Sequence, residues 1–517
     1  MTNSPRIAFR TDASIEIGTG HVMRCLTLAR AARDAGAACR FVTRALPGHM
    51  GGRIADEGFE VTLLPAPGGA APDGPPAHAH WARVDWPRDA EETRAALAAA
   101  PPDWLVVDHY AFDARWQRAV RTVGTKLMVI DDLADRRHEC EVLLDQNLGH
   151  EAGDYDGLVP DRCLRLTGPQ YALLRPEFAA ARAKALMDRA GRGLRHLLVT
   201  MGGVDRVDAT SAVLTALRDA PLPEGLRITV IMGSNAPALD RVRTLAQEMP
   251  WPTEVAVDVT DMAARMAAVD LAISAGGGTT WERCCLGLPS VIVETAGNQA
   301  GIARTMAAAG AAFDPGPVQA PDFARALHAA LREAGDPARL RAMSERAAAI
   351  CDGDGRARAA ARLLPPGVNF RNATCNDSRR VWDWRNATDK ALRMASEDTP
   401  YDQHDKWFRR AVNDPDRIIR IAMRGDLPCG YLRLDRTSRS CARVSVCLSP
   451  ETRGLGLGRW LLEEADRLGR HHGFARLTAE IHPQNIASRR VFARAGYEQD
   501  SIVNGFLTCH RTLEDAP

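Results

Sequence analysis

A repeated unit constrains this 517-residue chain more than any other feature: a short apolar run ends in a loop, and an amphipathic run follows. Residues 6–11 (RIAFRT) read as a strand, 22–36 (VMRCLTLARAARDAG) as a helix, and 39–44 as the next strand. Strands of the same kind recur at 104–110 and 126–132. Strands that alternate with helices predict a parallel α/β sheet.

A second run of the same kind begins at residue 196. After a later break, the sequence no longer shows the alternation of strands and helices. The later strands are expected at 196–203, 227–233, 271–278 and 289–295. Pro365-Pro366-Gly367 cannot continue a helix, and an antiparallel-looking stretch follows. We therefore predict two Rossmann-like halves with a cleft between them and a third domain, with the boundaries 1–180, 190–360 and 368–517. Ligands of such parallel sheets bind at the carboxyl ends of the strands.

Composition narrows the classes of function. The chain carries 66 Lys and Arg against 65 Asp and Glu, so its formal net charge of +1 gives no reason to expect a nucleic acid or a membrane as partner. Its 12 cysteines are scattered without a C-x-x-C spacing, which favours a reducing cytoplasm over disulfides or a zinc site. We see no signal peptide, and no run approaches the ~20 apolar residues of a membrane span.

Two glycine loops in the second run predict a phosphate site. In 274–282 (SAGGGTTWE) a strand ends, three glycines turn and a helix opens, so free backbone N–H groups and the helix dipole favour a diphosphate. Glu282 could then accept from ribose hydroxyls. The loop at 200–203 (TMGG) brings Gly202 and Gly203 to the same edge of the sheet. A plain structural turn is the alternative for either loop taken alone.

One histidine stands out by its position. The stretch 17–29 (IGTGHVMRCLTLA) sets His21 behind Gly18 and Gly20 at the start of a helix. A histidine of near-neutral pKa can take a proton from water, whereas a helix-capping or buried imidazole is the structural alternative. We expect four other histidines to be structural: His109, His138, His150 and His196.

Two further patterns could suggest a metal. The segment 65–90 is rich in Pro, Ala and Gly and carries His78, His80 and Trp81; we interpret it as a surface excursion of low order. The D-x-D pair at 352–354 is interpreted as a turn. We therefore expect no metal.

Several stretches of residues 5 to about 360, in this order, resemble the UDP-sugar enzymes of GT-B architecture. More closely, they resemble the hydrolases that remove UDP from UDP-2,4-diacetamido-2,4,6-trideoxy-β-L-altropyranose in pseudaminic acid biosynthesis. The stretches are FRTDASIEIGTGHVMRCLTLA, VVDHYAFDARW, IDDLADRRHECEVLLDQN, GPQYALLRPEF, VTMGGVD, SAGGGTTWE and ETAGNQ.

This resemblance assigns expected roles. His21 is the catalytic base for attack of water at C1 with inversion, and Tyr110 and Asn298 contact the reacting sugar. Arg10 and Asp12 line the same pocket. The UDP is expected on Gly202, Gly203, Gly276, Gly277, Gly278, Thr279, Thr280 and Glu282.

The C-terminal part carries a different glycine motif. Residues 453–458 (RGLGLG) join a strand to an amphipathic helix, and the N–H groups of such a turn suit a pyrophosphate. With 485–497 (NIASRRVFARAGY) and the pieces VWDWRN and HDKWF, they resemble the GNAT acetyltransferases over about 368–512. The resemblance implies acetyl-CoA as co-substrate, with its pyrophosphate on Arg453, Gly454, Gly456 and Gly458 and its pantetheine beside Asn485.

The acetyltransferase resemblance has one departure. Many GNAT members carry a tyrosine seven residues after the asparagine as general acid, and this chain has Phe492 there. Tyr497 is close in sequence, but its position usually belongs to packing. His404 could bind the substrate or cap a helix.

Together these features predict a bifunctional enzyme. The C-terminal domain would N-acetylate the 4-amino group of a UDP-amino sugar with acetyl-CoA, and the N-terminal pair would then release UDP. The alternatives are a GT-B glycosyltransferase, or a sugar-nucleotide-binding module fused to a protein N-acetyltransferase. A related N-acyl sugar of the same nonulosonic class is equally compatible as substrate.

Overall fold

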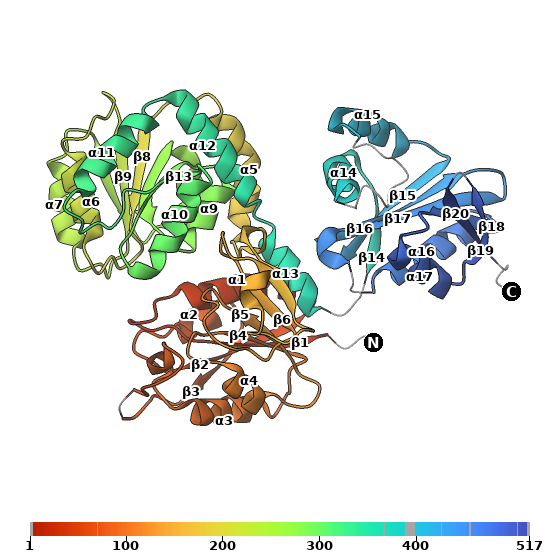
Figure 1. Cartoon of the computed structure of the whole chain (residues 1–517), viewed down its shortest axis with the longest axis horizontal. Coiled ribbons are helices and arrows are strands. Elements are labelled where there is room, and N and C mark those ends of the chain that lie inside the picture. Colours follow the sequence, from red (N-terminus) through yellow and green to blue (C-terminus); the bar gives the residue numbers. More distant parts are fainter. Residues whose placement is uncertain are drawn as a thin grey trace. The chain divides into compact units, whose positions relative to one another are not determined.

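The computed structural model describes residues 4–69, 71–364, 368–387, 399–424, 427–453, 456–503 and 505–513. Its described strands form three sheets, and helices surround each of them (Figure 1). Contacts between Cα atoms divide the chain into two compact units. The larger unit comprises Arg6–Arg30 and Cys39–Ala359 and holds most of the first sheet and all of the second, and the smaller unit, which is mainly the chain from Ala360 onward, holds the third sheet.

The first sheet has the order β3-β2-β1-β4-β5-β6-β7. Strand β4 runs parallel to both β1 and β5, so the loops that follow these strands leave the same edge. The strands are β1 (Arg6–Thr11), β2 (Ala38–Arg44), β3 (Glu60–Leu64), β4 (Trp104–Asp108), β5 (Lys126–Ile130), β6 (Val142–Asp145) and β7 (Leu164–Thr167). The helices are α1 (Gly20–Asp34), α2 (Gly51–Asp56), α3 (Trp86–Leu97) and α4 (Ala114–Val120), with the 3₁₀ turns η1 (Ala79–Ala82), η2 (Ala152–Tyr155) and η3 (Pro169–Tyr171).

Helix α1 shows why this sequence folds as it does. Val22, Cys25, Leu26 and Ala29 recur at helical spacing, and all four are buried. The apolar strands β1, β4 and β5 are almost wholly buried, as expected for a parallel sheet covered on both faces.

The second sheet is parallel throughout, with the order β10-β9-β8-β11-β12-β13. Its strands are β8 (His196–Thr200), β9 (Arg227–Met232), β10 (Thr253–Val257), β11 (Leu271–Ala275), β12 (Ser290–Val293) and β13 (Ala312–Phe313). The helices along residues 176–363 are α5 (Pro176–Arg189), α6 (Ala209–Leu217), α7 (Leu239–Gln247), α8 (Met262–Ala268), α9 (Thr279–Cys285), α10 (Ala300–Ala308), α11 (Phe323–Ala334), α12 (Pro337–Ile350) and α13 (Gly355–Leu363), with η4 (Gly297–Gln299). Because α5 packs on α8, α9 and α12, the predicted limit at residue 180 falls inside a helix of this half.

The third sheet is mostly antiparallel, with the order β14-β15-β16-β17-β18-β20-β19. Its strands are β14 (Asn369–Asn372), β15 (Arg417–Arg424), β16 (Leu427–Arg436), β17 (Cys441–Leu448), β18 (Arg476–Ile481), β19 (Glu498–Val503) and β20 (Phe506–Thr512). Its helices are α14 (Ser378–Asn386), α15 (Tyr401–Ala411), α16 (Gly458–His471) and α17 (Ile486–Arg494), with η5 (Cys375–Asp377) and η7 (Pro450–Thr452). The predicted order, two Rossmann-like halves followed by a third domain of different architecture, is confirmed.

Candidate functional site

His21 lies at the carboxyl edge of the first sheet, in the first turn of α1. Thr11, the last residue of β1, pairs with Asp108, the last residue of β4. The loop after β1 therefore returns α1 to a point where His21 Nδ1 is 2.6 Å from Asp108 Oδ1. No described residue hydrogen-bonds the other ring nitrogen, Nε2.

A chain of charged groups fixes this pair. Arg24, one turn further along α1, donates to both oxygens of Asp108 at 2.6 and 2.7 Å and to Asp132 at 2.5 Å. Burial alone would raise the pKa of Asp108, but the charge of Arg24 and the hydrogen bonds from Arg24 and His21 hold the pKa below its ordinary value. Asp108 therefore stays ionised and accepts a hydrogen bond from Nδ1–H of His21. When the ring is neutral, this tautomer leaves Nε2 as a proton acceptor.

Aromatic rings surround the imidazole. The ring centroid of Tyr110 lies 4.7 Å from that of His21, and its hydroxyl donates to Asp132 at 2.8 Å. Burial and the charge of Asp132 raise the pKa of Tyr110, so its phenol stays neutral. Trp81 stacks on Tyr110 at 5.4 Å. Residues 79–82 form η1, and Ala82 and Val84 are buried, so this segment is more ordered than its composition predicts.

Arg10 and Asp12, which are expected to line the same pocket, are both fully buried. Arg10 forms ion pairs with Asp12 at 2.6 Å and with Asp89 at 2.7 Å. Asp12 also lies 3.3 Å from Nε2 of His109. These contacts tie both side chains to the ionic network beneath the site, and His109 is buried in the same network.

The two glycine loops of the second half leave neighbouring strands at one edge of the sheet, because β8 and β11 pair in parallel. Gly202 has a φ of +92° and borders open space, as do Gly203, Gly277 and Gly278. A Cβ on Gly276 would lie 3.2 Å from that of Gln299, so the loop 294–299 packs against this turn. Three loops thus meet where a diphosphate is expected.

Two of the predicted UDP contacts are already occupied within the protein. Thr280 is 1% exposed, and its hydroxyl accepts from Arg283 at 3.0 Å and from Gly277 N at 3.4 Å. Thr280 holds the loop together, whereas Thr279 is exposed, although its hydroxyl also accepts from Arg283 at 3.2 Å. Glu282 lies 3.4 Å from Arg175, and burial raises the pKa of its carboxyl. The side chain of Asn298 lies outside the described residues.

In the third sheet, two neighbouring strands separate. β17 and β18 run parallel, and the described pairing joins only residues 441–443 to 476–478, at their amino ends. The loop after β17 leads to α16, where Gly456 has a φ of +77° and open space around it. A Cβ on Gly458 would come within 2.9 Å of Val491, so a glycine is required for the packing of α16 on α17. Gly454 lies outside the described residues.

The remaining predicted acetyl-CoA contacts also make internal hydrogen bonds. Arg453 donates to the carbonyl of Ala387 at 3.0 Å. Asn485 caps α17 by accepting from Ser488 N at 3.0 Å. Phe492 is 5% exposed and packs edge-on against Tyr497 at 4.9 Å. Burial raises the pKa of Tyr497 far above its ordinary range, so a packing role suits this tyrosine.

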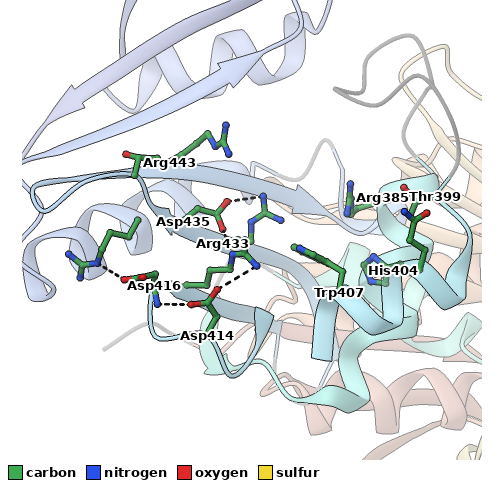
Figure 2. Close-up of a pocket in the computed structure, with 13 residues that line it drawn as sticks. Arg385, Thr399, His404, Trp407, Asp414, Asp416, Arg433, Asp435 and Arg443 are labelled. Carbon is green, nitrogen blue, oxygen red and sulfur yellow. Dashed lines mark hydrogen bonds and ion pairs between the residues drawn. The ribbon is translucent and has the colours of Figure 1, made fainter. Parts of the chain in front are cut away.

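A cavity of about 580 Å³ opens beside α15 (Figure 2). Trp407 lies on one side, with the guanidinium groups of Arg433, Arg385 and Arg417 at 5.2, 5.9 and 5.9 Å from its ring. His404 lines the cavity too, but it is 1% exposed and its Nε2 donates to the carbonyl of Ser378 at 3.1 Å. The sequence alone does not indicate this cavity, because its lining residues come from separate segments that include α14, α15 and three strands.

Asp108, Arg24 and Asp132 were likewise not singled out as functional residues. The signal available was position: Asp108 and Asp132 lie at or near the carboxyl ends of the predicted strands 104–110 and 126–132, and Arg24 lies one turn after His21. Within the described ranges, no group of three or more His, Cys, Asp or Glu side chains is arranged to hold a metal. None of the described helices is both long and apolar enough to span a membrane.

Several known proteins match parts of this chain. The acetyltransferase (GNAT) family matches residues 380–497. The chain is 33% identical over 149 residues to the spore coat polysaccharide biosynthesis protein SpsG of Bacillus subtilis, covering 29% of this chain and 43% of that protein. It is 26% identical over 244 residues to the UDP-2,4-diacetamido-2,4,6-trideoxy-beta-L-altropyranose hydrolase of Campylobacter jejuni, covering 47% and 74%.

Among solved structures, MurG of Acinetobacter baumannii aligns with a TM-score of 0.51 and 15% identity, covering 70% of this chain and 99% of that one. This likeness shows the fold alone, and the chain spans less than half the length of SpsG. The chain therefore combines a GT-B fold with a C-terminal domain that matches the GNAT acetyltransferase family.

Proposed function

We propose that the N-terminal GT-B part hydrolyses a UDP-linked N-acylated amino sugar at C1. The observation that carries this proposal is the imidazole of His21, held through Nδ1 by an ionised Asp108 and open at Nε2. The sequence similarity to the C. jejuni hydrolase supports UDP-2,4-diacetamido-2,4,6-trideoxy-β-L-altropyranose as the substrate.

The geometry suits a simple displacement. A water oxygen adds to C1 while the bond from C1 to the UDP oxygen breaks, and Nε2 of His21 takes the proton of that water. Asp108 and Arg24 keep the ring in the tautomer that can accept it. The open glycines at 202–203 and 277–278 offer backbone N–H groups to the departing diphosphate.

We propose that the GNAT domain transfers an acetyl group from acetyl-CoA to the amine of a UDP-4-amino-4,6-dideoxy sugar. The opening between β17 and β18 and the glycine-bearing start of α16 fit an extended thioester ligand with a pyrophosphate. Acetyl-CoA supplies the activated acyl group: the amine nitrogen bonds to the acetyl carbon as the carbon–sulfur bond breaks, and CoA leaves as the thiol with the proton that the amine loses. The protein orients the amine against it, and proximity accounts for much of the acceleration.

One coupled assay tests both activities. The full chain is incubated with acetyl-CoA and the UDP-4-amino-4,6-dideoxy sugar, and the acetylated intermediate, UDP and free sugar are followed by mass spectrometry. We expect the acetylated intermediate first, and then UDP and free sugar in equal amounts. Turnover of UDP-GlcNAc alone would contradict the substrate, and transfer of the sugar to an added acceptor without free sugar would contradict hydrolysis.

A further inference from the structure

A cavity next to the catalytic histidine raises the question of why water, and not a larger hydroxyl compound, should react. The cavity measures about 660 Å³ and has mostly apolar walls, including Ile15, Leu46, Pro47 and Trp81. It is large enough for an alcohol or a sugar. His21 is not among the described residues that line it.

Trp81 is the residue that the cavity shares with the catalytic group. Its ring lines the cavity and lies edge-on to the imidazole, with 6.0 Å between the centroids. Tyr110 covers a second side of the imidazole at 4.7 Å. The side chain of His21 is 10% exposed, which leaves room for a small molecule at its edge.

The position of Trp81 is well supported. Its ring stacks on Tyr110, whose hydroxyl is held by Asp132, and it packs against His78 at 4.7 Å. His80, the preceding residue, lies 3.4 Å from Glu16 in the loop that leads to α1. Arg83 follows with a φ of 60°, a conformation that non-glycine residues adopt rarely and mostly where the surroundings impose it.

We propose that Trp81 is a specificity-determining residue that separates this cavity from His21 and so selects water over larger hydroxyl compounds. The inference rests on the proposed hydrolysis. Without the indole, an alcohol in the cavity could reach the same position as water. Its oxygen would add to C1 as the bond to UDP breaks, and its proton would pass to Nε2 of His21. The products would be a glycoside and UDP.

Glycerol is the probe in the test, and the measurement is the ratio of glyceryl glycoside to free sugar formed from the UDP-diacetamido sugar. The full chain is compared with Trp81→Ala, Trp81→Phe and a matched control, Trp86→Ala. Trp86 lies on α3, where Arg115 packs over its ring, and it does not line the cavity. Because the ratio is counted per turnover, it does not depend on how much of a variant is folded.

We expect the ratio to rise about tenfold or more in Trp81→Ala, the scale of discrimination that a few buried carbon atoms provide. It should rise less in Trp81→Phe and stay unchanged in Trp86→Ala. Equal ratios in the wild type and both Trp81 variants would overturn the proposal while leaving hydrolysis intact. So would loss of turnover in both variants, since Trp81 would then serve the reaction itself. A wild type that releases no UDP would overturn the proposed hydrolysis and this inference with it.

Discussion

The two candidate sites position their reacting groups in different ways. Around His21, charged side chains from α1, β4 and the loop after β5 bond one another directly, so the tautomer of one imidazole is set by Asp108, Arg24 and Asp132. Around the opening between β17 and β18, the features that suit the ligand are a strand separation and a glycine turn of the main chain.

This difference predicts which substitutions should reduce the activity of each site. A proton acceptor depends on a particular atom with a particular protonation state, so single side chains should dominate the first site. A domain that orients a thioester through its main chain should respond chiefly to changes of backbone shape and packing.

The largest effect is expected for His21→Ala. Loss of the proton acceptor should slow UDP release by about 10²–10⁴-fold, the usual contribution of a general base. Acetyl transfer by the same preparation serves as the control for folding and should not change. UDP release within a factor of two of the wild type would contradict this difference between the two sites, because the first site would then not depend on its histidine.

Asp108→Asn should have the next largest effect. An amide cannot hold Nδ1–H as the carboxylate does, and it leaves the buried Arg24 charge half-paired. We expect a fall of roughly 10²-fold in the turnover number for UDP release with a smaller change in KM. Steady-state kinetics over a range of pH would measure it. An unaltered pH profile together with normal turnover would show that Asp108 does not act through His21.

Gly458→Ala tests whether the acetyl-CoA site depends on the packing of its backbone. The new methyl group would lie 2.9 Å from Val491, and the resulting shift of α16 should cost about 1–3 kcal/mol of unfolding free energy. The KM for acetyl-CoA should rise several-fold, while UDP release from the pre-acetylated sugar nucleotide stays unchanged. Ser488→Ala on α17 is the control, because the variant keeps the backbone N–H that donates to Asn485.

The smallest effect is expected in the way the free energy of unfolding depends on pH. The pKa of Asp108 is lowered in the folded protein, so its ionised form stabilises the fold above the pKa of the unfolded chain, about 3.9, and this contribution is lost as the pH falls below it. The unfolding free energy of the wild type should therefore exceed that of Asp108→Asn by on the order of 1–3 kcal/mol at pH 7. The gap should narrow as the pH falls through 4, as followed by urea denaturation. A gap independent of pH would show that the ion pairs do not stabilise the fold.

Much of the fold could be predicted from local patterns. The apolar strands and the amphipathic α1 fall where their periodicity predicts, and the glycine turns at 276–278 and 456–458 join a strand to a helix as expected. The errors concern burial. Arg10 lies near the carboxyl end of β1 and Asp12 directly follows it, a position typical of ligand-binding residues, yet Asp89 from α3 and Arg44 from β2 enclose them in an ionic network.

By itself, the sequence determined the α/β class, the change of architecture near residue 367 and the place of His21 at a helix start, because these follow from spacing along the chain. Only the tertiary structure decided that Asp108 and Arg24 control this histidine, that Thr280 holds its loop together, and that Trp81 covers the imidazole. The physical reason is that ion pairs and ring contacts act over a few ångströms, and the groups that make them come from segments whose distance in space no local pattern encodes.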